Sequence, residues 1–179
     1  VIARGEASYD ELDLIHSKLD FELGSRGAFL NKLIYCPHYP DIGFSGEVKE
    51  LKVECDCRKP KVGMAVKACE TYKINFSSSW MVGDTTTDLK FAETLGMNSV
   101  LVRTGFGGRD KRINCQPDFI FEHLGEAAKF ITDDYPRYQK FIKTYLSSFM
   151  DQNIILIGGK SRAGKSTFSK VLEKLLKNL

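Results

Sequence analysis

Apolar residues along this chain occur either at helical spacing or in short continuous runs. Residues 12–23 carry leucine or isoleucine every three or four positions, which predicts an amphipathic helix. A capping box formed by Ser8 and Glu11 marks its start, and Gly24 or Gly27 marks its end. Short apolar runs bounded by turn residues predict buried strands. The predicted strands are 30–35, 80–82, 99–102 and 119–121, and the further predicted helices are 64–72, 88–95 and 124–131.

Strands that alternate with helices of about ten residues indicate an α/β fold, a three-layer, Rossmann-like parallel sheet with helices on its faces. We expect this domain to span 1–131, followed by a connecting helix and linker over 132–152. A new buried strand at 154–157 opens a second, partial domain over 153–179. Because the first residue is Val1 and the last lies within a helical pattern, we expect a piece of a longer protein cut at both ends.

Composition narrows the classes of function. The chain has 179 residues, of which 42% are hydrophobic and 27% charged, and its net charge of +3 is too small to indicate a nucleic-acid partner. No apolar run approaches the roughly 20 residues of a membrane span. The first residues lack the basic and apolar regions of a signal peptide, so we expect a cytoplasmic protein with reduced cysteines.

Four metal-type ligands fall in two short clusters, Cys36 with His38 and Cys55 with Cys57. Three thiols and one imidazole form a complete tetrahedral set for Zn²⁺ with no position left open, which is typical of a structural site. Prolines and glycines mark the stretch between the clusters as loop, where thiols have no core to fill. The alternatives are ordinary buried thiols or a disulfide.

Two further groups of residues are of types that bind phosphate or the Mg²⁺ that accompanies it. Asp84 and Asp88 flank a strand-to-helix turn and together suit Mg²⁺, which takes few carboxylates; the alternative is that both cap the helix. Arg58 and Lys59 directly follow the last cysteine, and fixed cations beside a carboxylate-held Mg²⁺ are what phosphoryl transfer requires. The alternative for this pair is an ordinary solvated surface loop.

Residues 159–166 match the phosphate-binding P-loop, G-x-x-x-x-G-K-[ST], between a predicted strand and a predicted helix. Backbone amides of this loop, which begins at Gly159 and turns at Gly164, would cradle the phosphates of ATP or GTP. Lys165 would reach the outer phosphates and the Ser166 hydroxyl would bind Mg²⁺.

Residues 1–131 resemble the haloacid-dehalogenase superfamily, in its zinc-containing branch of D-glycero-D-manno-heptose 1,7-bisphosphate phosphatase and histidinol phosphatase. The resemblance rests on Ile-Ala-Arg-Gly at 2–5, Tyr-Cys-Pro-His at 35–38, Cys-Asp-Cys-Arg-Lys-Pro at 55–60 with Gly-Met at 63–64, and Val-Gly-Asp at 82–84 with Asp88. The tail from residue 154 resembles the opening of a P-loop small-molecule kinase.

The resemblance implies that Cys36, His38, Cys55 and Cys57 bind structural zinc. It further implies that Arg58 recognises the substrate, that Lys59 stabilises the transferred phosphoryl group and that Asp84 ligates magnesium. Two departures stand out. The family's D-x-D nucleophile motif and its Thr/Ser-Asn-Gln segment are absent from this sequence, and Thr85, which we expect to contact the substrate, stands where heptose phosphatases carry Lys.

These residues predict a magnesium-dependent phosphatase acting on a phosphorylated sugar through an aspartyl-phosphate formed on a residue outside this sequence. By itself, the chain is expected to show little or no activity. Two alternatives remain open: a bifunctional protein whose main activity is ATP-dependent phosphorylation through the C-terminal P-loop, and a non-catalytic, zinc-stabilised module.

Overall fold

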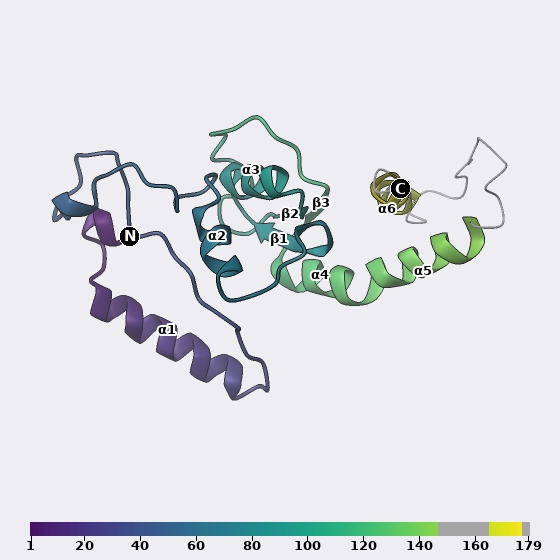
Figure 1. Ribbon diagram of the computed structural model, residues 1–179, viewed down its shortest axis with the longest axis horizontal. Helices are drawn as coiled ribbons and strands as arrows, with labels where there is room; N and C mark the ends of the chain where they lie inside the picture. The colour runs from purple at the N-terminus through teal and green to yellow at the C-terminus, as the bar shows by residue number, and fades with distance from the viewer. Residues whose placement is uncertain (147–164, 177–179) are drawn as a thin grey trace. The chain divides into compact units, whose positions relative to one another are not determined.

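The computed structural model describes residues 1–146 and 165–176, which belong to two compact units of the chain (Figure 1). The first unit comprises Val1–Trp80 with Lys90–Asn98, and the second comprises Met81–Leu89 with Ser99–Leu179. The division passes through single elements of secondary structure. Each unit is therefore a group of residues that contact one another and not one continuous stretch of chain.

The first unit is mostly loop, punctuated by helices. Its longest helix, α1 (Tyr9–Gly24), begins at the predicted capping box, where the Ser8 Oγ accepts from the Glu11 amide at 3.2 Å and the Glu11 carboxylate accepts from the Ser8 amide at 2.8 Å. The predicted helix is therefore confirmed. The others are η1 (Ile2–Arg4), η2 (Lys49–Leu51), α2 (Gly63–Cys69) and η3 (Phe76–Ser78).

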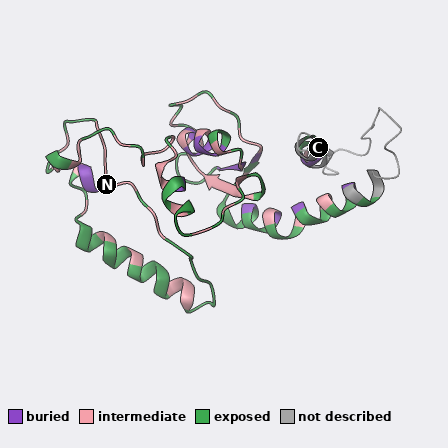
Figure 2. Cartoon of the chain, viewed as in Figure 1, coloured by how far each residue is buried: buried purple, intermediate pink, exposed green. Residues whose placement is uncertain are grey.

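Helix α1 is held by local signals more than by packing. None of its residues is buried (Figure 2). The Leu14 and Phe21 residues are 71% and 73% exposed. The Tyr35 ring lies 5.4 Å from the ring of His16, measured between centroids. The reciprocal cap satisfies amides at the start of the helix that would otherwise lack a partner, which explains why the helix starts at Tyr9.

The strand predicted over residues 30–35 is wrong. This segment is irregular, and the Asn31 carbonyl accepts from the Tyr72 hydroxyl at 2.8 Å instead of from a neighbouring strand. An apolar run becomes a strand only when another strand satisfies its backbone groups. The cysteine loop is tied instead to the start of the chain, because the Ala3 amide donates to the Pro37 carbonyl and the Val48 amide donates to the Ala3 carbonyl, each at 3.2 Å.

A three-stranded sheet, in the order β1-β2-β3, forms within the described residues. Its strands are β1 (Trp80–Gly83), β2 (Asn98–Val102) and β3 (Phe119–Phe121), and α3 (Thr86–Leu95) connects the first two. β2 and β3 are parallel, with Val100 opposite Phe119. Every residue of β2 is buried, as expected for a central strand of a parallel sheet. The predicted strands here, and the helix over 88–95, are confirmed.

After β3 the chain runs helically from Leu124 to Leu146, with no break at the end of the predicted 124–131 helix. The run consists of α4 (Leu124–Lys129), a π-helical segment η4 (Phe130–Asp134) and α5 (Tyr135–Leu146). The Phe130 ring lies 4.8 Å from that of Phe119 and 5.9 Å from that of Tyr135, so the π-helical turn packs an aromatic cluster over β3.

The second unit also contains α6 (Lys165–Leu176), where Val171 and Leu172 are buried. The strand predicted at 154–157 lies outside the described residues, and the predicted domain boundaries remain predictions. Within the part of the chain that the structure describes, no helix combines the length and apolar character needed to cross a membrane.

Candidate functional site

The four predicted metal ligands come together. One donor atom from each of Cys36, His38, Cys55 and Cys57 lies within 4.8 Å of the other three. The Cys57 Sγ is 3.1 Å from that of Cys36 and 3.3 Å from that of Cys55, and the Cys36 and Cys55 sulfurs are 3.5 Å apart. The His38 Nδ1 lies 3.3 Å from the Cys57 sulfur and 3.8 Å from the Cys36 sulfur.

These separations fit a tetrahedral zinc site. With Zn–S bonds of about 2.3 Å, the edges of the tetrahedron between sulfurs are about 3.8 Å, so small outward movements of the side chains would admit the ion. All four residues are partly buried, and the cysteines are free thiols, not disulfides. The donor set and its spacing therefore fit Zn²⁺, and the disulfide alternative is wrong for these residues.

The electrostatics of the cluster show what a cation would supply. Desolvation raises the pKa of Cys57 to about 12, with further contributions from Cys36 and Cys55. Desolvation also raises the pKa of Cys36. The pKa of Cys55 is lowered, because hydrogen bonds from Cys57 and Cys36 outweigh its desolvation. Burial and the proximity of the other thiols thus oppose full deprotonation of the set, and a cation bound among the three sulfurs would favour it.

Arg58 is fixed by the metal loop itself. Its guanidinium lies 4.3 Å from the centre of the Tyr39 ring, and its Nη1 donates to the His38 carbonyl at 3.2 Å. Lys59 follows directly on the chain and is partly buried. The turn after them closes where the Gly63 amide donates to the Asp56 carbonyl at 2.8 Å, an approach so close that a Cβ at Gly63 would collide with that carbonyl.

A cation–aromatic cluster that the sequence did not predict lies beside this loop. Arg4 and Lys52 both lie over the Tyr39 and Phe44 rings, at 4.9–5.6 Å from the ring centres. The Lys52 side chain is only 5% exposed, with its Nζ 3.3 Å from a Glu47 carboxylate oxygen. The cluster braces the same ring that carries Arg58, and no sequence spacing would have revealed it.

Asp84 stands at the carboxyl end of β1, as predicted, and is held by the loop that follows β2. The Phe106 amide donates to the Asp84 Oδ2 at 2.7 Å, and the Gly108 amide donates to the Asp84 carbonyl at 2.8 Å. Gly105, at φ +67°, makes this approach possible, because a Cβ there would collide with the Asp84 carboxylate. Asp84 is thus a partly buried carboxylate with a fixed orientation.

Asp88 makes the contacts of a capping residue. It is 4% exposed, and its Oδ2 accepts from the Thr85 amide at 3.1 Å and from the Thr85 hydroxyl at 2.6 Å. These bonds close the turn that opens α3. The Thr85 hydroxyl is therefore engaged within the turn, and the roles of Asp88 in magnesium binding and of Thr85 in substrate binding remain predictions.

Asp110 was not identified from the sequence. Its two carboxylate oxygens accept from the Thr86 amide at 2.9 Å and from the Thr86 hydroxyl at 2.7 Å. Desolvation raises the pKa of Asp110, but these hydrogen bonds outweigh it, with a smaller contribution from Arg112, and the net pKa lies below its usual value. The Asp110 carboxylate therefore stays ionised at the start of α3, where the helix dipole also favours it.

The predicted residues thus form two groups. The candidate zinc ligands, together with Arg58 and Lys59, belong to the first unit, and Asp84 and Asp88 belong to the second. Most of the predicted P-loop, including Gly159 and Gly164, lies outside the described residues. Its last two positions, Lys165 and Ser166, begin α6.

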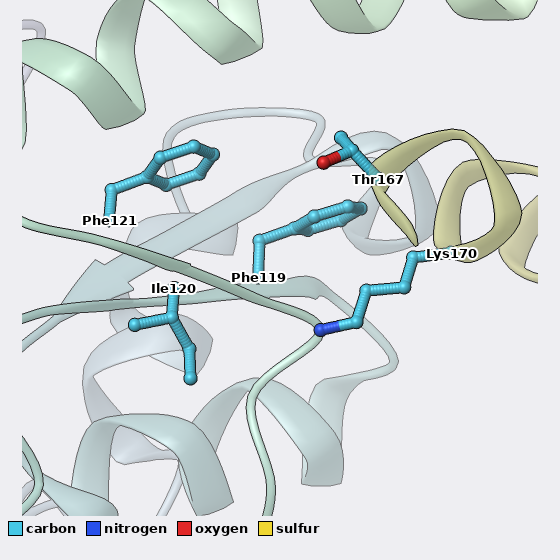
Figure 3. Close-up of a pocket in the computed structure, with 5 residues that line it drawn as sticks. All are labelled: Phe119, Ile120, Phe121, Thr167 and Lys170. Carbon is cyan, nitrogen blue, oxygen red and sulfur yellow. The ribbon is translucent and has the colours of Figure 1, made fainter. Parts of the chain in front are cut away.

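A small open cavity of about 110 Å³ lies in the second unit, between β3 and the start of α6 (Figure 3). Phe119, Ile120 and Phe121 of β3 line it together with Thr167 and Lys170 of α6. Ligand pockets usually enclose about 300–1,000 Å³, so this cavity is too small to hold a substrate of the predicted class.

Comparison with known proteins identifies relatives over most of the described chain. A family model described as HAD-hydrolase-like matches residues 56–127. The D-glycero-beta-D-manno-heptose-1,7-bisphosphate 7-phosphatase of Pseudomonas putida is 39% identical over 130 residues, which cover 72% of this chain and 67% of that protein. Enzymes of the same name in Pseudomonas aeruginosa and Haemophilus ducreyi are 38% and 42% identical, over 60% and 58% of this chain.

A solved structure shares the fold. The D,D-heptose 1,7-bisphosphate phosphatase from B. bronchiseptica, crystallised with magnesium and phosphate, aligns with a TM-score of 0.61 at 28% identity, over 74% of this chain and 69% of that one. The fold and the matches define a hydrolase of the phosphoric-monoester class. The chain belongs to the haloacid-dehalogenase-like hydrolase family. It spans about half the length of the P. aeruginosa and H. ducreyi relatives, at 54% and 56%.

Proposed function

We propose that this chain forms the zinc-binding and magnesium-binding part of a phosphatase that hydrolyses a phosphomonoester of a sugar, with a heptose 1,7-bisphosphate as the leading substrate. The observation that carries the proposal is the assembled cysteine–histidine cluster with Arg58 fixed against it, in a chain whose relatives are named heptose bisphosphate phosphatases. Zinc would be structural, because all four ligand positions are filled by protein.

Each residue of the proposed site has a separate task. Arg58 presents a planar guanidinium, already oriented by Tyr39 and the His38 carbonyl, for contact with a phosphate group. The Lys59 ammonium would neutralise charge on the group being transferred. Asp84 would hold Mg²⁺, which suits a site of one or two carboxylates and would supply further charge neutralisation when bound.

The nucleophile of the proposed reaction is an aspartate that this sequence does not supply as a D-x-D motif. Attack of that carboxylate on phosphorus would release the sugar hydroxyl and form an aspartyl-phosphate, which water would then hydrolyse. The 179-residue chain alone is therefore expected to release little or no phosphate. Clear turnover by this chain would show that the nucleophile assignment is wrong.

The activity is tested by phosphate release from the whole protein that carries this chain, with Mg²⁺ and a panel of sugar phosphates. We expect Lys59→Ala to lower kcat by about 10²–10³-fold, the usual effect of removing a positioned charge. Lys61→Ala is the matched control, since Lys61 is exposed and paired with Glu54 at 2.9 Å. Equal rates for both variants would refute the catalytic role of Lys59.

We propose nucleotide binding at the C-terminal P-loop as a second function. It is favoured by the complete motif and by the start of α6 at Lys165, where the motif requires a helix to begin. Protection of the whole protein by ATP or GTP against thermal unfolding should disappear in Lys165→Ala and persist in Lys170→Ala, a change on the same helix. The absence of protection in the wild-type protein would exclude this function.

A further inference from the structure

The loop over residues 105–115 is hydrogen-bonded to the turn at the end of β1 through two groups of contacts. The first comprises the Phe106 and Gly108 amides, which donate to Asp84. The second group of contacts involves Thr86, which is 7% exposed and forms hydrogen bonds with three residues of the loop. Asp110 accepts from its amide and hydroxyl, the Ile113 amide donates to its hydroxyl at 3.1 Å, and the Cys115 thiol donates to its carbonyl at 3.3 Å.

Thr86 connects the loop to the turn that carries Asp84. It lies two residues after Asp84 and is the first residue of α3. Its amide is one of those that a helix leaves without an intrahelical partner, and Asp110, 24 residues further along the chain, satisfies it. A movement of Thr86 would rotate the turn and shift the Asp84 carboxylate, because only one residue separates them.

We propose that Asp110 is a positioning residue: through Thr86 it fixes the turn that presents the Asp84 carboxylate to a divalent cation. The cation part of this inference rests on the proposed function, in which Asp84 ligates Mg²⁺. The clamp itself, meaning the hydrogen bonds from the Thr86 amide and hydroxyl to Asp110, is a property of the metal-free protein. Asp110 acts only through Thr86 and has no role in contact with substrate.

The chain offers matched controls. The Asp118 Oδ2 accepts from the Ser99 amide at 2.8 Å and from the Ser99 hydroxyl at 2.9 Å, the same pattern of donors at the beginning of β2. Asp118→Asn therefore removes the charge of a carboxylate that accepts from the same two types of donor elsewhere in the same unit, there through one oxygen. Thr86→Val removes the hydroxyl without changing any charge, and Thr86→Ser keeps the hydroxyl.

The first measurement is hydrogen exchange in the metal-free protein. In Asp110→Asn and Thr86→Val, we expect amide exchange of residues 84–89 to rise about tenfold, with exchange in β2 unchanged. Asp118→Asn and Thr86→Ser should leave residues 84–89 at the wild-type rate. Wild-type exchange there in Asp110→Asn, or an equal rise in Asp118→Asn, would overturn the inference, because the turn would then be fixed by other contacts or by general stability.

The second measurement is a titration with Mg²⁺ alone, followed by the backbone amide shifts of residues 83–87. We expect Asp110→Asn and Thr86→Val each to raise the Mg²⁺ dissociation constant about tenfold and both controls to stay within about twofold. Weakening in Asp110→Asn but not in Thr86→Val would indicate a direct charge effect and overturn the positioning role. Lack of Mg²⁺ binding by the wild-type protein would count against the proposed function, while the exchange data would still decide whether the clamp exists.

Discussion

At the scale of single residues, the metal ligands make the most direct prediction. Replacing Cys57 with serine removes one of the three sulfurs of the cluster, so the zinc content of the purified chain should fall well below the expected value of about one ion per chain. Cys69→Ser is the control, because Cys69 is exposed and lies outside the cluster. The measurement is metal analysis after gel filtration. Equal zinc content in both variants would contradict the ligand assignment.

A second residue-scale prediction concerns Gly105. Alanine there must adopt a left-handed φ, at a cost of about 1 kcal/mol, and its Cβ must also displace the Asp84 carboxylate, which adds about 1–3 kcal/mol. Gly27→Ala separates the two effects, since Gly27 has φ +73° and open space around a Cβ. Urea unfolding should show the larger loss of stability for Gly105→Ala. Equal losses would mean that the contact with Asp84 carries no energy.

Single residues differed in how far the sequence alone revealed them. The grouping of the four candidate zinc ligands was predictable, because one residue separates the two members of each pair and both pairs lie in one loop. Asp110 was not, because its partner Thr86 lies 24 residues away and an isolated Asp-Lys in a loop has no distinctive spacing. Asp88 shows that residue type alone does not reveal a role. An aspartate could bind a metal ion, but in the structure its Oδ2 accepts two capping hydrogen bonds from Thr85.

At the scale of elements, local signals decided what could be predicted. Helix α1 and strands β1, β2 and β3 carry their own caps, glycines and apolar runs, and all were correctly predicted from the sequence. The segment 30–35 has the composition of a strand, but its pairing depends on other chain segments, which no local pattern specifies. The helical run from 124 to 146 likewise continues because Phe130 packs on Phe119, a tertiary contact.

The start of α1 makes a pH-dependent prediction at this scale. The Ser8 amide and hydroxyl lower the folded-state pKa of Glu11 below its usual 4.5, so the stabilisation is fully present above that value and is lost as the pH falls through the folded pKa. The protection factors of the amides in the first turn, which correct for the intrinsic pH dependence of exchange, should therefore fall below about pH 4.5 in the wild-type chain. Glu11→Gln should remove this pH dependence, whereas Asp10→Asn, a change in the same turn outside the capping box, should retain it.

At the scale of the whole molecule, the division into two units changes how the site is understood. The sequence predicted one α/β domain over 1–131 that carries a zinc-bound loop. The structure places the zinc cluster, Arg58 and Lys59 in a loop-rich unit, and the parallel sheet with Asp84 in another. The loop-rich unit has few regular elements and a small apolar core, so a metal ion would contribute a large share of its folding free energy.

Chelation tests that division directly. Removing zinc leaves three thiols and an imidazole in close contact, where desolvation raises the pKa of Cys57 to about 12 and no cation offsets the repulsion between thiolates. We therefore expect a chelator to accelerate amide exchange first over residues 36–60, with no change in β2. Zinc should restore protection and Mg²⁺ should not, because the donor set is three sulfurs and one nitrogen, which suits zinc and not a cation that prefers oxygen. Exchange over 36–60 that is unaffected by the chelator would show that the cluster holds no structural metal. Arg58 would then be held by the Tyr39 ring and the His38 carbonyl without help from a metal ion.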